Sequence, residues 1–374
     1  MKLECSKKLL DYLKIKPQKT VSEGPADPLF AWTVNLILIN RRKTVVVVNQ
    51  AFRCLFVLYG ITAKSIPVLP TLILDGIRGM LKSEYVKPEI IERYLDDCGR
   101  EITFTANSSR SVAALCTKAC KRVSIYSDLF AKNDMFQQTL LPWFNDELIP
   151  GGTCRYAPEV LMTQLQERYG EAVVACRAVE LEVTLNLQTP CKRTLVVPAD
   201  LSFYQLHRIL QGAFEWHDCH LHQFILERDA NGSPSKIIGV TDEDQAAFDE
   251  LMHVTRLDSV AYQVGTVMQM YTKIEYEYDF GDGWMHTVLC KGFIDDCEVP
   301  YPHCLEAIGD APMEDSGGPS GFAETMKIMN DPSDPEHREV CDWVRGTWWR
   351  PVNLKLINAR IKHKHRVSMP DDFE

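Results

Sequence analysis

The sequence predicts an α+β protein of two domains, each with a mixed or antiparallel sheet and packed helices. At 374 residues the chain exceeds the usual size of one hydrophobic core. Short runs rich in β-branched residues are interspersed with longer amphipathic segments. The charge is also uneven, because residues 1–175 hold 23 Lys and Arg against 18 Asp and Glu, whereas residues 176–374 hold 18 against 33. We therefore expect domains at 1–172 and 173–374.

The sequence of the N-terminal half predicts both strands and helices, in mixed order. Ser6 is the expected N-cap of a short helix that presents Leu9, Leu10 and Leu13 on one face. Apolar runs rich in β-branched residues predict strands at 30–39, 44–48, 54–59 and 102–105. Helices are expected at 67–81, 88–98 and 109–122, and the first two begin with a proline that suits the first helical turn.

Three consecutive basic residues, Arg41, Arg42 and Lys43, lie at the expected turn between the first two strands. They form a candidate anion-binding site through which the N-terminal domain would contact nucleic acid. The alternative is a solvated turn, as runs of charge usually are. The acidic C-terminal half is a poor candidate for binding a phosphate backbone, because that binding depends on Lys and Arg.

The domain boundary is marked by Gly151, Gly152 and Pro158, where the composition changes. A helix is expected at 159–169, and either domain could contain it. Beyond the boundary, alternating apolar residues predict a strand at 179–187, and a second strand at 194–197 is its expected partner.

A helix is expected to follow these two strands. Ser202 and Gln205 match a capping box, in which the two side chains satisfy free backbone N–H groups at a helix start. Phe203, Leu206 and Leu210 then recur at helical spacing, so this helix must pack on the sheet.

The most informative stretch is 273–290, which predicts a β-hairpin with a polar end. Apolar or aromatic residues alternate with polar ones on both sides of a turn, as in half-buried strands; the alternating set is Ile274, Tyr276, Tyr278, Trp284, His286, Val288 and Cys290. Gly281 and Gly283 allow the positive φ angles that a tight connection needs. Asp279, Asp282 and His286 are therefore expected to gather at one end of the hairpin.

Five residues form a candidate polar site, the last two in a loop rich in glycine and proline: Asp279, Asp282, His286, Glu314 and Asp315. An overlapping set of imidazoles and carboxylates forms a candidate metal site: His220, His222, Asp282, His286 and Glu314. Such ligands suit a divalent metal, zinc or manganese, with one position left for water. The alternative is a buried hydrogen-bond network in which His286 pairs with a carboxylate.

Three other motifs carry less weight. Cys304 follows His303, but neighbours on a strand point to opposite sides, so this is a poor nucleophile and base pair. Hairpin aromatics could stack on a base, although aromatics in hairpins usually pack in the core; they are Tyr276, Tyr278, Phe280 and Trp284. The glycine turns 281–283 and 317–318 lack the strand and helix context of a phosphate loop.

The cysteines and apolar runs bear on the compartment. Thirteen cysteines without CxxC spacing fit neither a zinc ribbon nor a disulfide framework, so reduced thiols are the simpler expectation. No apolar run approaches the roughly 20 residues that span a bilayer, and the first residues lack the apolar region of a signal peptide. We expect a cytoplasmic protein with no membrane partner.

Several motifs, in this order, resemble the plasmid pRiA ORF-three-like family, also labelled insertion-element passenger proteins of a TnpR-like type. They are Leu206–Phe214, His220–Phe224, Tyr278–His286 and Pro312–Phe322, within a match over about 179–361. The resemblance implies an α+β fold and an association with plasmids and mobile elements, and it brings no activity. The chain departs from the family pattern at Pro190–Arg193 and at Ala311, where a cysteine is often found.

The N-terminal half, over about 1–150, resembles a bacterial domain of unknown function through Leu3–Leu10 and the Trp32–Tyr59 block.

Three classes of function stay open. The first is a regulatory or interaction protein of mobile-element or host-defence context, binding a partner protein or small ligand through the C-terminal domain. The second is a metal-dependent hydrolase acting on nucleotides or nucleic acid, and the third is a nucleic-acid-binding protein that uses the N-terminal basic face. No motif supplies a complete nucleophile, base and stabiliser, which favours the first class.

Overall fold

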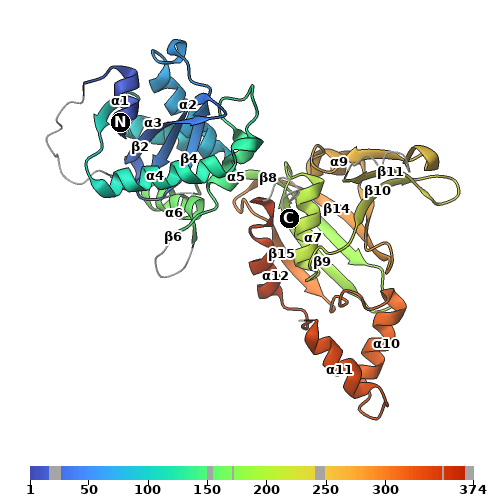
Figure 1. Cartoon of the computed structure of the whole chain (residues 1–374). Helices are drawn as coiled ribbons and strands as arrows, with labels where there is room; N and C mark the ends of the chain where they lie inside the picture. Colours follow the sequence, from blue (N-terminus) through green and yellow to red (C-terminus); the bar gives the residue numbers. More distant parts are fainter. Residues whose placement is uncertain (17–26, 150–154, 171, 241–248, 348, 367–374) are drawn as a thin grey trace. The chain divides into compact units, whose positions relative to one another are not determined.

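The computed structural model describes residues 1–16, 27–149, 155–170, 172–240, 249–347 and 349–366. The chain divides into two compact units, Met1–Ala175 and Cys176–Glu374, each built around its own hydrophobic core (Figure 1). The predicted α+β class is confirmed. Gly151 and Gly152, on which the boundary prediction relied, lie outside the described residues.

The N-terminal unit contains a five-stranded sheet in the order β4-β3-β2-β1-β5. Its strands are β1 (Lys2–Cys5), β2 (Trp32–Ile39), β3 (Arg42–Asn49), β4 (Leu55–Tyr59) and β5 (Thr103–Ala106). β1 pairs in parallel with both β2 and β5, whereas β2, β3 and β4 are antiparallel. β1 was not among the predicted strands, because four residues ahead of a helix cap give too short a pattern to recognise.

Helices cover both faces of this sheet. They are α1 (Lys7–Leu13), α2 (Leu69–Ser83), α3 (Pro88–Asp97), α4 (Arg110–Ile125), α5 (Leu141–Phe144) and α6 (Ala157–Tyr169). Phe56 of β4 lies against Gly76 of α2, where a Cβ would stand only 2.1 Å from its ring. Val45–Val48 of β3 are all buried, as a strand covered on both faces requires.

Two smaller details complete this unit. Ser6 accepts a hydrogen bond from the Leu9 N–H at 3.3 Å, so the predicted cap of α1 is confirmed. Helix α6 buries Leu161 and Leu165 in the N-terminal core, which assigns the helix between the two halves to this unit. A short pair of strands, β6 (Leu148–Ile149) and β7 (Arg155–Tyr156), precedes it.

The C-terminal unit contains an eight-stranded sheet in the order β12-β11-β10-β13-β14-β8-β9-β15. Its strands are β8 (Cys176–Leu185), β9 (Cys191–Pro198), β10 (His222–Arg228), β11 (Pro234–Gly239), β12 (Thr255–Asp258), β13 (Lys273–Tyr278), β14 (Trp284–Cys297) and β15 (His303–Ile308). All neighbours pair antiparallel except β11 and β12, which are parallel.

Helix α7 (Phe203–Ala213) packs on this sheet (Figure 1). The predicted capping box is present, because the Ser202 hydroxyl accepts from the Gln205 N–H at 3.2 Å and the Gln205 side chain accepts from the Ser202 N–H at 2.8 Å. The remaining helices are α9 (Val264–Met270), α10 (Gly318–Asn330), α11 (His337–Gly346) and α12 (Leu354–Ile361). Ile361 of α12 packs beside Gly212 of α7.

The predicted hairpin is β13 and β14, with Tyr278 opposite Trp284 and Tyr276 opposite His286. Six residues of its predicted alternating set are buried, and the seventh, Cys290, is half-buried. β10 pairs with the other edge of β13 and sets His222 opposite Tyr278. The start of β10 and the turn of the hairpin therefore lie at the same end of the sheet.

Candidate functional site

The turn of the β13–β14 hairpin carries the first acidic group of the candidate site. Asp279 follows Tyr278 and adopts a left-handed conformation with φ 55°, which Asp tolerates better than most residues. Its carboxylate accepts hydrogen bonds from the N–H groups of Gly281 at 2.9 Å and Asp282 at 3.3 Å. The other carboxylate oxygen is free to face a neighbouring segment.

The loop before α10 carries the second acidic group, Asp315, also left-handed with φ 59°. This loop contacts the hairpin turn directly, because the Asp282 carboxylate accepts from the Gly317 N–H at 3.1 Å. Gly318 has φ +70°, and a Cβ there would stand 2.5 Å from the Asp282 carbonyl oxygen. Only glycine allows so close an approach of the two backbones.

His220, just before β10, completes a group that we call the His220 site: His220, Asp279 and Asp315. The Nε2 atom of His220 lies 3.6 Å from a carboxylate oxygen of Asp279 and 3.3 Å from one of Asp315. This Nε2 atom is buried, and neither oxygen has the geometry of a hydrogen bond to it. The side chain of Asp315 is 75% exposed, so the site is open to solvent on that side.

Glu314 supports the His220 site from beside it. Its carboxylate accepts from the Tyr278 hydroxyl and, at 3.1 Å, from the His217 N–H. The Tyr278 ring in turn meets the His220 ring edge-on, with centroids 5.8 Å apart. Burial and the adjacent Glu314 carboxylate raise the pKa of Tyr278. Its hydroxyl therefore stays protonated and donates a hydrogen bond to Glu314.

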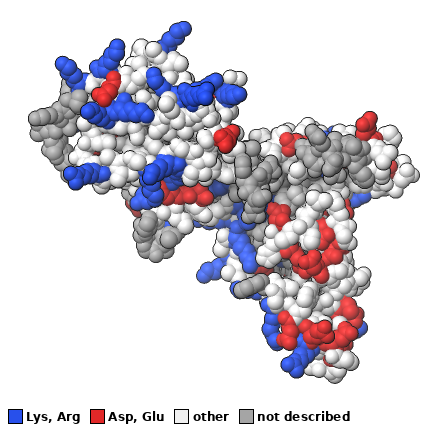
Figure 2. Space-filling model, viewed as in Figure 1, with Lys and Arg blue, Asp and Glu red and all other residues white. Residues whose placement is uncertain are grey.

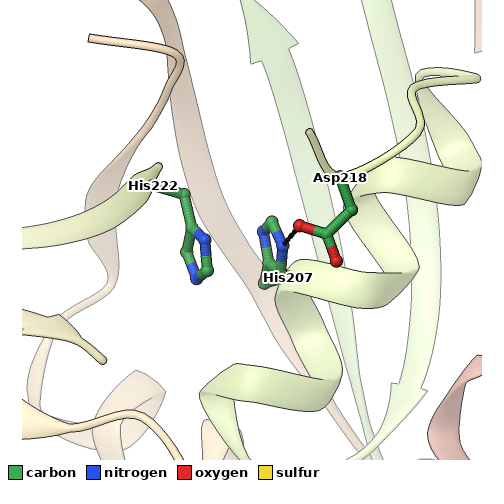
Figure 3. Close-up of side chains that lie close together, drawn as sticks. All are labelled: His207, Asp218 and His222. Carbon is green, nitrogen blue, oxygen red and sulfur yellow. Dashed lines mark hydrogen bonds and ion pairs between the residues drawn. The ribbon is translucent and has the colours of Figure 1, made fainter. Parts of the chain in front are cut away.

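A second group, the His207 cluster, consists of His207, Asp218 and His222 (Figure 3). His207 Nε2 lies 2.6 Å from the Asp218 carboxylate, and His207 Nδ1 lies 2.8 Å from the Tyr276 hydroxyl. Arg208 donates to the other Asp218 oxygen at 3.0 Å. The rings of His207 and His222 stack with centroids 3.4 Å apart and planes only 4° from parallel.

Burial disfavours protonation in the His207 cluster. Burial lowers the pKa of His207 although Asp218 opposes that shift, and burial together with the charge of His207 lowers the pKa of His222 well below its usual range. Two parallel rings 3.4 Å apart also cannot both direct an in-plane lone pair at one ion about 2.1 Å away. In this stack His207 is hydrogen-bonded to Asp218 and Tyr276, whereas the Nε2 atom of His222 is buried without a hydrogen-bond partner.

His286 was predicted to join Asp282, and the structure does not bring them together. The His286 side chain is fully buried, and its Nδ1 lies 3.2 Å from each of the Tyr276 and Trp284 carbonyl oxygens. Burial lowers the pKa of His286 to about 3. The prediction erred because His286 belongs to the inward face of β14, whereas Asp282 lies in the turn beyond the end of the strand.

The structure thus divides the predicted site residues into four groups. Asp279, Asp315 and His220 converge, while Asp282 and Glu314 hold the loops that carry them. His222 stacks on His207, and His286 is buried in the core. His207 and Asp218 were missed by sequence reasoning; the available signal was an imidazole among the apolar, inward positions of α7.

The other candidate motifs are engaged elsewhere. Arg42 donates to the Lys132 carbonyl at 2.6 Å and lies over the Tyr59 ring, while Lys43 lies over the Tyr12 ring. Asn40 and Arg41 have positive φ values of 48° and 64°, so they form the tight turn itself. On the face shown in Figure 2, Lys and Arg predominate over the N-terminal unit, and Asp and Glu gather in patches over the C-terminal unit.

Cys304 and His303 do not form a catalytic pair. The Cys304 thiol is buried and donates to the Glu306 carbonyl at 3.0 Å, while His303 Nδ1 lies 3.2 Å from the Tyr301 carbonyl. Burial also raises the pKa of Cys304, which disfavours a thiolate. Of the hairpin aromatics, Tyr276, Tyr278 and Trp284 are core residues and Phe280 is exposed.

Comparison with known proteins places the C-terminal unit in a family. Residues 177–356 match the family described as plasmid pRiA4b ORF-3-like protein, and the chain belongs to it. Residues 2–157 match a domain of unknown function, DUF6933. The resemblances expected for the two halves are both confirmed.

A curated relative is the uncharacterized protein y4hQ of Sinorhizobium fredii, 32% identical over 186 residues that cover 49% of this chain and 90% of the relative. A solved structure, a protein of unknown function from Methanosarcina mazei, is 24% identical with a TM-score of 0.39, covering 45% of this chain and 88% of that chain. Across the part of the chain that the structure describes, no helix is long and apolar enough to cross a membrane.

Proposed function

We propose that this member of a plasmid-associated family acts as a binding module whose C-terminal unit holds a divalent metal ion at the His220 site. The observation that carries the proposal is the position of His220 Nε2, which is buried, without a hydrogen bond, and 3.3 and 3.6 Å from two carboxylate oxygens. Two ligand atoms on a tetrahedral zinc ion are about 3.4 Å apart, given bonds of about 2.1 Å. One ligand atom from each of the three residues lies within 4.8 Å of the other two, close enough for the three to share one ion.

Three further features support this proposal. Both acidic ligands adopt left-handed backbone conformations, and such strain often occurs at functional sites. The carboxylates of Asp282 and Glu314 fix the two loops from outside the group. The net negative charge of the C-terminal half would also attract a cation.

The exposed side of the site distinguishes binding from catalysis. With three protein ligands the ion would keep one coordination position open. That position would face solvent on the side where Asp315 is exposed, and a group of a partner protein or small ligand would coordinate there. A hydrolase would need a base beside a metal-bound water in the same place. Glu314 is a poor candidate for that base because its Oε1 atom already accepts from both Tyr278 and His217, which leaves only Oε2 for the role. We therefore favour the binding role over the metal-dependent hydrolase.

Titration calorimetry of the full-length reduced protein tests the proposal. Manganese is the first probe because thiols, abundant in this chain, bind it poorly, and zinc should then bind more tightly by the Irving–Williams order. We expect one site per chain, and Asp315→Asn and His220→Ala should each weaken binding by about tenfold or more. His217→Ala, which removes an exposed imidazole three residues away, should bind as the parent does.

Two results would overturn the metal site. One is a parent protein that binds neither manganese nor zinc with defined stoichiometry. The other is binding that His217→Ala weakens as much as His220→Ala does. If metal binds as expected and a phosphodiester is then cleaved by the parent but not by Asp315→Asn, the hydrolase replaces the binding module as the function of this site.

A further inference from the structure

Two cysteines lie opposite each other where β8 begins and β14 ends. Cys176 is the first residue of β8, Cys297 is the last of β14, and the two are register partners in this antiparallel pair. Opposite residues on antiparallel strands project to the same face, with Cα atoms about 4.5 to 5.5 Å apart. That separation lies within the range of about 4.4 to 6.8 Å that a disulfide requires.

The pairing depends on an irregularity in β14. Ile294 is opposite Ala178 and Cys297 is opposite Cys176, so β14 advances three residues while β8 advances two. This is a β-bulge, with one extra residue on β14. Without it Asp296, an exposed acid, would face Cys176. The bulge therefore places the second thiol opposite the first.

The two thiols also share one hydrogen-bond acceptor. Cys297 Sγ lies 3.4 Å and Cys176 Sγ 3.9 Å from the carbonyl oxygen of Val299. Donation to a single atom brings the two sulfur atoms near one another. Burial and the neighbouring Cys297 raise the pKa of Cys176 to about 12, so its thiol is protonated at neutral pH.

We propose that Cys176 and Cys297 are a redox-modification site that closes to a disulfide when a low-molecular-weight disulfide is available. The thiol of the more exposed residue, Cys297 at 8% against 5% for Cys176, attacks the oxidant as a thiolate and releases one thiol. Cys176 then loses its proton, attacks the mixed disulfide at Cys297 and releases a second thiol. Two protein thiols are oxidised and one disulfide molecule is reduced to two thiols.

The bond would fasten the first residue of the C-terminal unit to the end of β14. Because strand ends open more readily than strand centres, the start of β8 gains most from the link. Amide exchange at 177–179 should therefore slow in the oxidised protein. The His220 site is not involved, so this inference is independent of the proposed metal.

Peptide mapping of the full-length protein tests the pair directly. The experiment uses the Cys219→Ser variant, which lacks an exposed thiol. This protein is reduced and then equilibrated with oxidised and reduced glutathione. It is next quenched with acid, alkylated and digested. We expect linked peptides that contain Cys176 and Cys297, two hydrogens lighter than the reduced pair and separated again by dithiothreitol. Cys297→Ser should abolish the link.

A matched control is the pair Cys116 and Cys120, which are also buried but lie four residues apart on α4. Their Cα–Cβ bonds tilt in the same direction along the helix. We therefore expect both to remain thiols during the oxidation and to be alkylated afterwards. The proposal is overturned if Cys176 and Cys297 remain thiols under conditions that fully glutathionylate Cys219 in the parent. It is equally overturned if either is linked to another cysteine instead.

Discussion

Four histidines of the C-terminal unit fall into two physical states. His286 and His207 are buried and His222 is half-buried, all three pack against rings, and burial lowers the pKa of each. His220 instead directs a buried, unbonded nitrogen at two carboxylates near the surface. The first state contributes packing and the second offers a ligand atom, so substitutions at the two positions should have different consequences.

We predict that His286→Ala lowers the free energy of unfolding by about 3 kcal/mol, because it leaves a cavity among the Phe214, Trp216 and Tyr276 rings. The loss should be the same with and without manganese. His220→Ala should change metal-free stability little but remove the stabilisation that manganese gives the parent. Urea unfolding of all three proteins with and without manganese checks both expectations; a His286→Ala protein as stable as the parent would contradict the first.

The two loops of the His220 site act as one element because their backbones are in contact. The hydrogen bond from Gly317 to Asp282 and the close approach at Gly318 hold Asp315 over the hairpin turn. Neither loop carries all three ligands, so the site exists only while the loops stay together. Substitution of the glycine at this contact therefore tests the site while every ligand residue is retained.

We predict that Gly318→Ala weakens manganese binding, since the new Cβ would stand 2.5 Å from the Asp282 carbonyl and push the loops apart. Gly232→Ala is the matched control, because its φ of +84° carries a similar strain of about 1 kcal/mol but its Cβ would meet nothing within 4 Å. The control should lose a similar amount of stability and keep parental affinity in calorimetry. Equal affinities for the two variants would show that loop contact does not position Asp315.

The molecule as a whole is two units with separate cores and different titratable groups. The match to the Sinorhizobium relative covers 49% of this chain and 90% of the relative. The family match begins at residue 177, next to the division of the structure between Ala175 and Cys176. All ten histidines lie in the second unit, between His207 and His365.

We predict that fragments 1–175 and 176–374 each fold on their own, because each encloses a hydrophobic core. Circular dichroism during urea unfolding should give one cooperative transition for each fragment. The predicted boundary near residue 172 would move Val173, a buried member of the N-terminal core, and Val174, which packs against that core, to the second fragment. Fragments that aggregate or unfold without a transition would show that the units depend on each other.

We also predict that acid destabilises the second fragment first. Burial lowers the pKa of four histidines, His207, His222, His286 and His365, the last two to about 3. The unfolded chain then binds more protons below pH 6.5, so stability is present above that pH and is lost as pH falls toward the folded values. Each contributes up to about 1.4 kcal/mol of loss at pH 5.5. The urea midpoint of fragment 176–374 should fall between pH 7 and 5.5, and that of fragment 1–175, which has no histidine, should stay nearly constant.

The sequence by itself determined the elements whose signals are local. Alternation over 273–290 predicted the hairpin and its buried face, and Ser202 with Gln205 predicted the start of α7, because strand pleat and helix capping depend on residues close in the chain. Only the tertiary structure decided which polar groups meet. His220 reaches Asp279 and Asp315 through the register of β10 on β13 and the contact of Gly317 with Asp282. Those contacts join residues 35 or more positions apart, and no local periodicity encodes them.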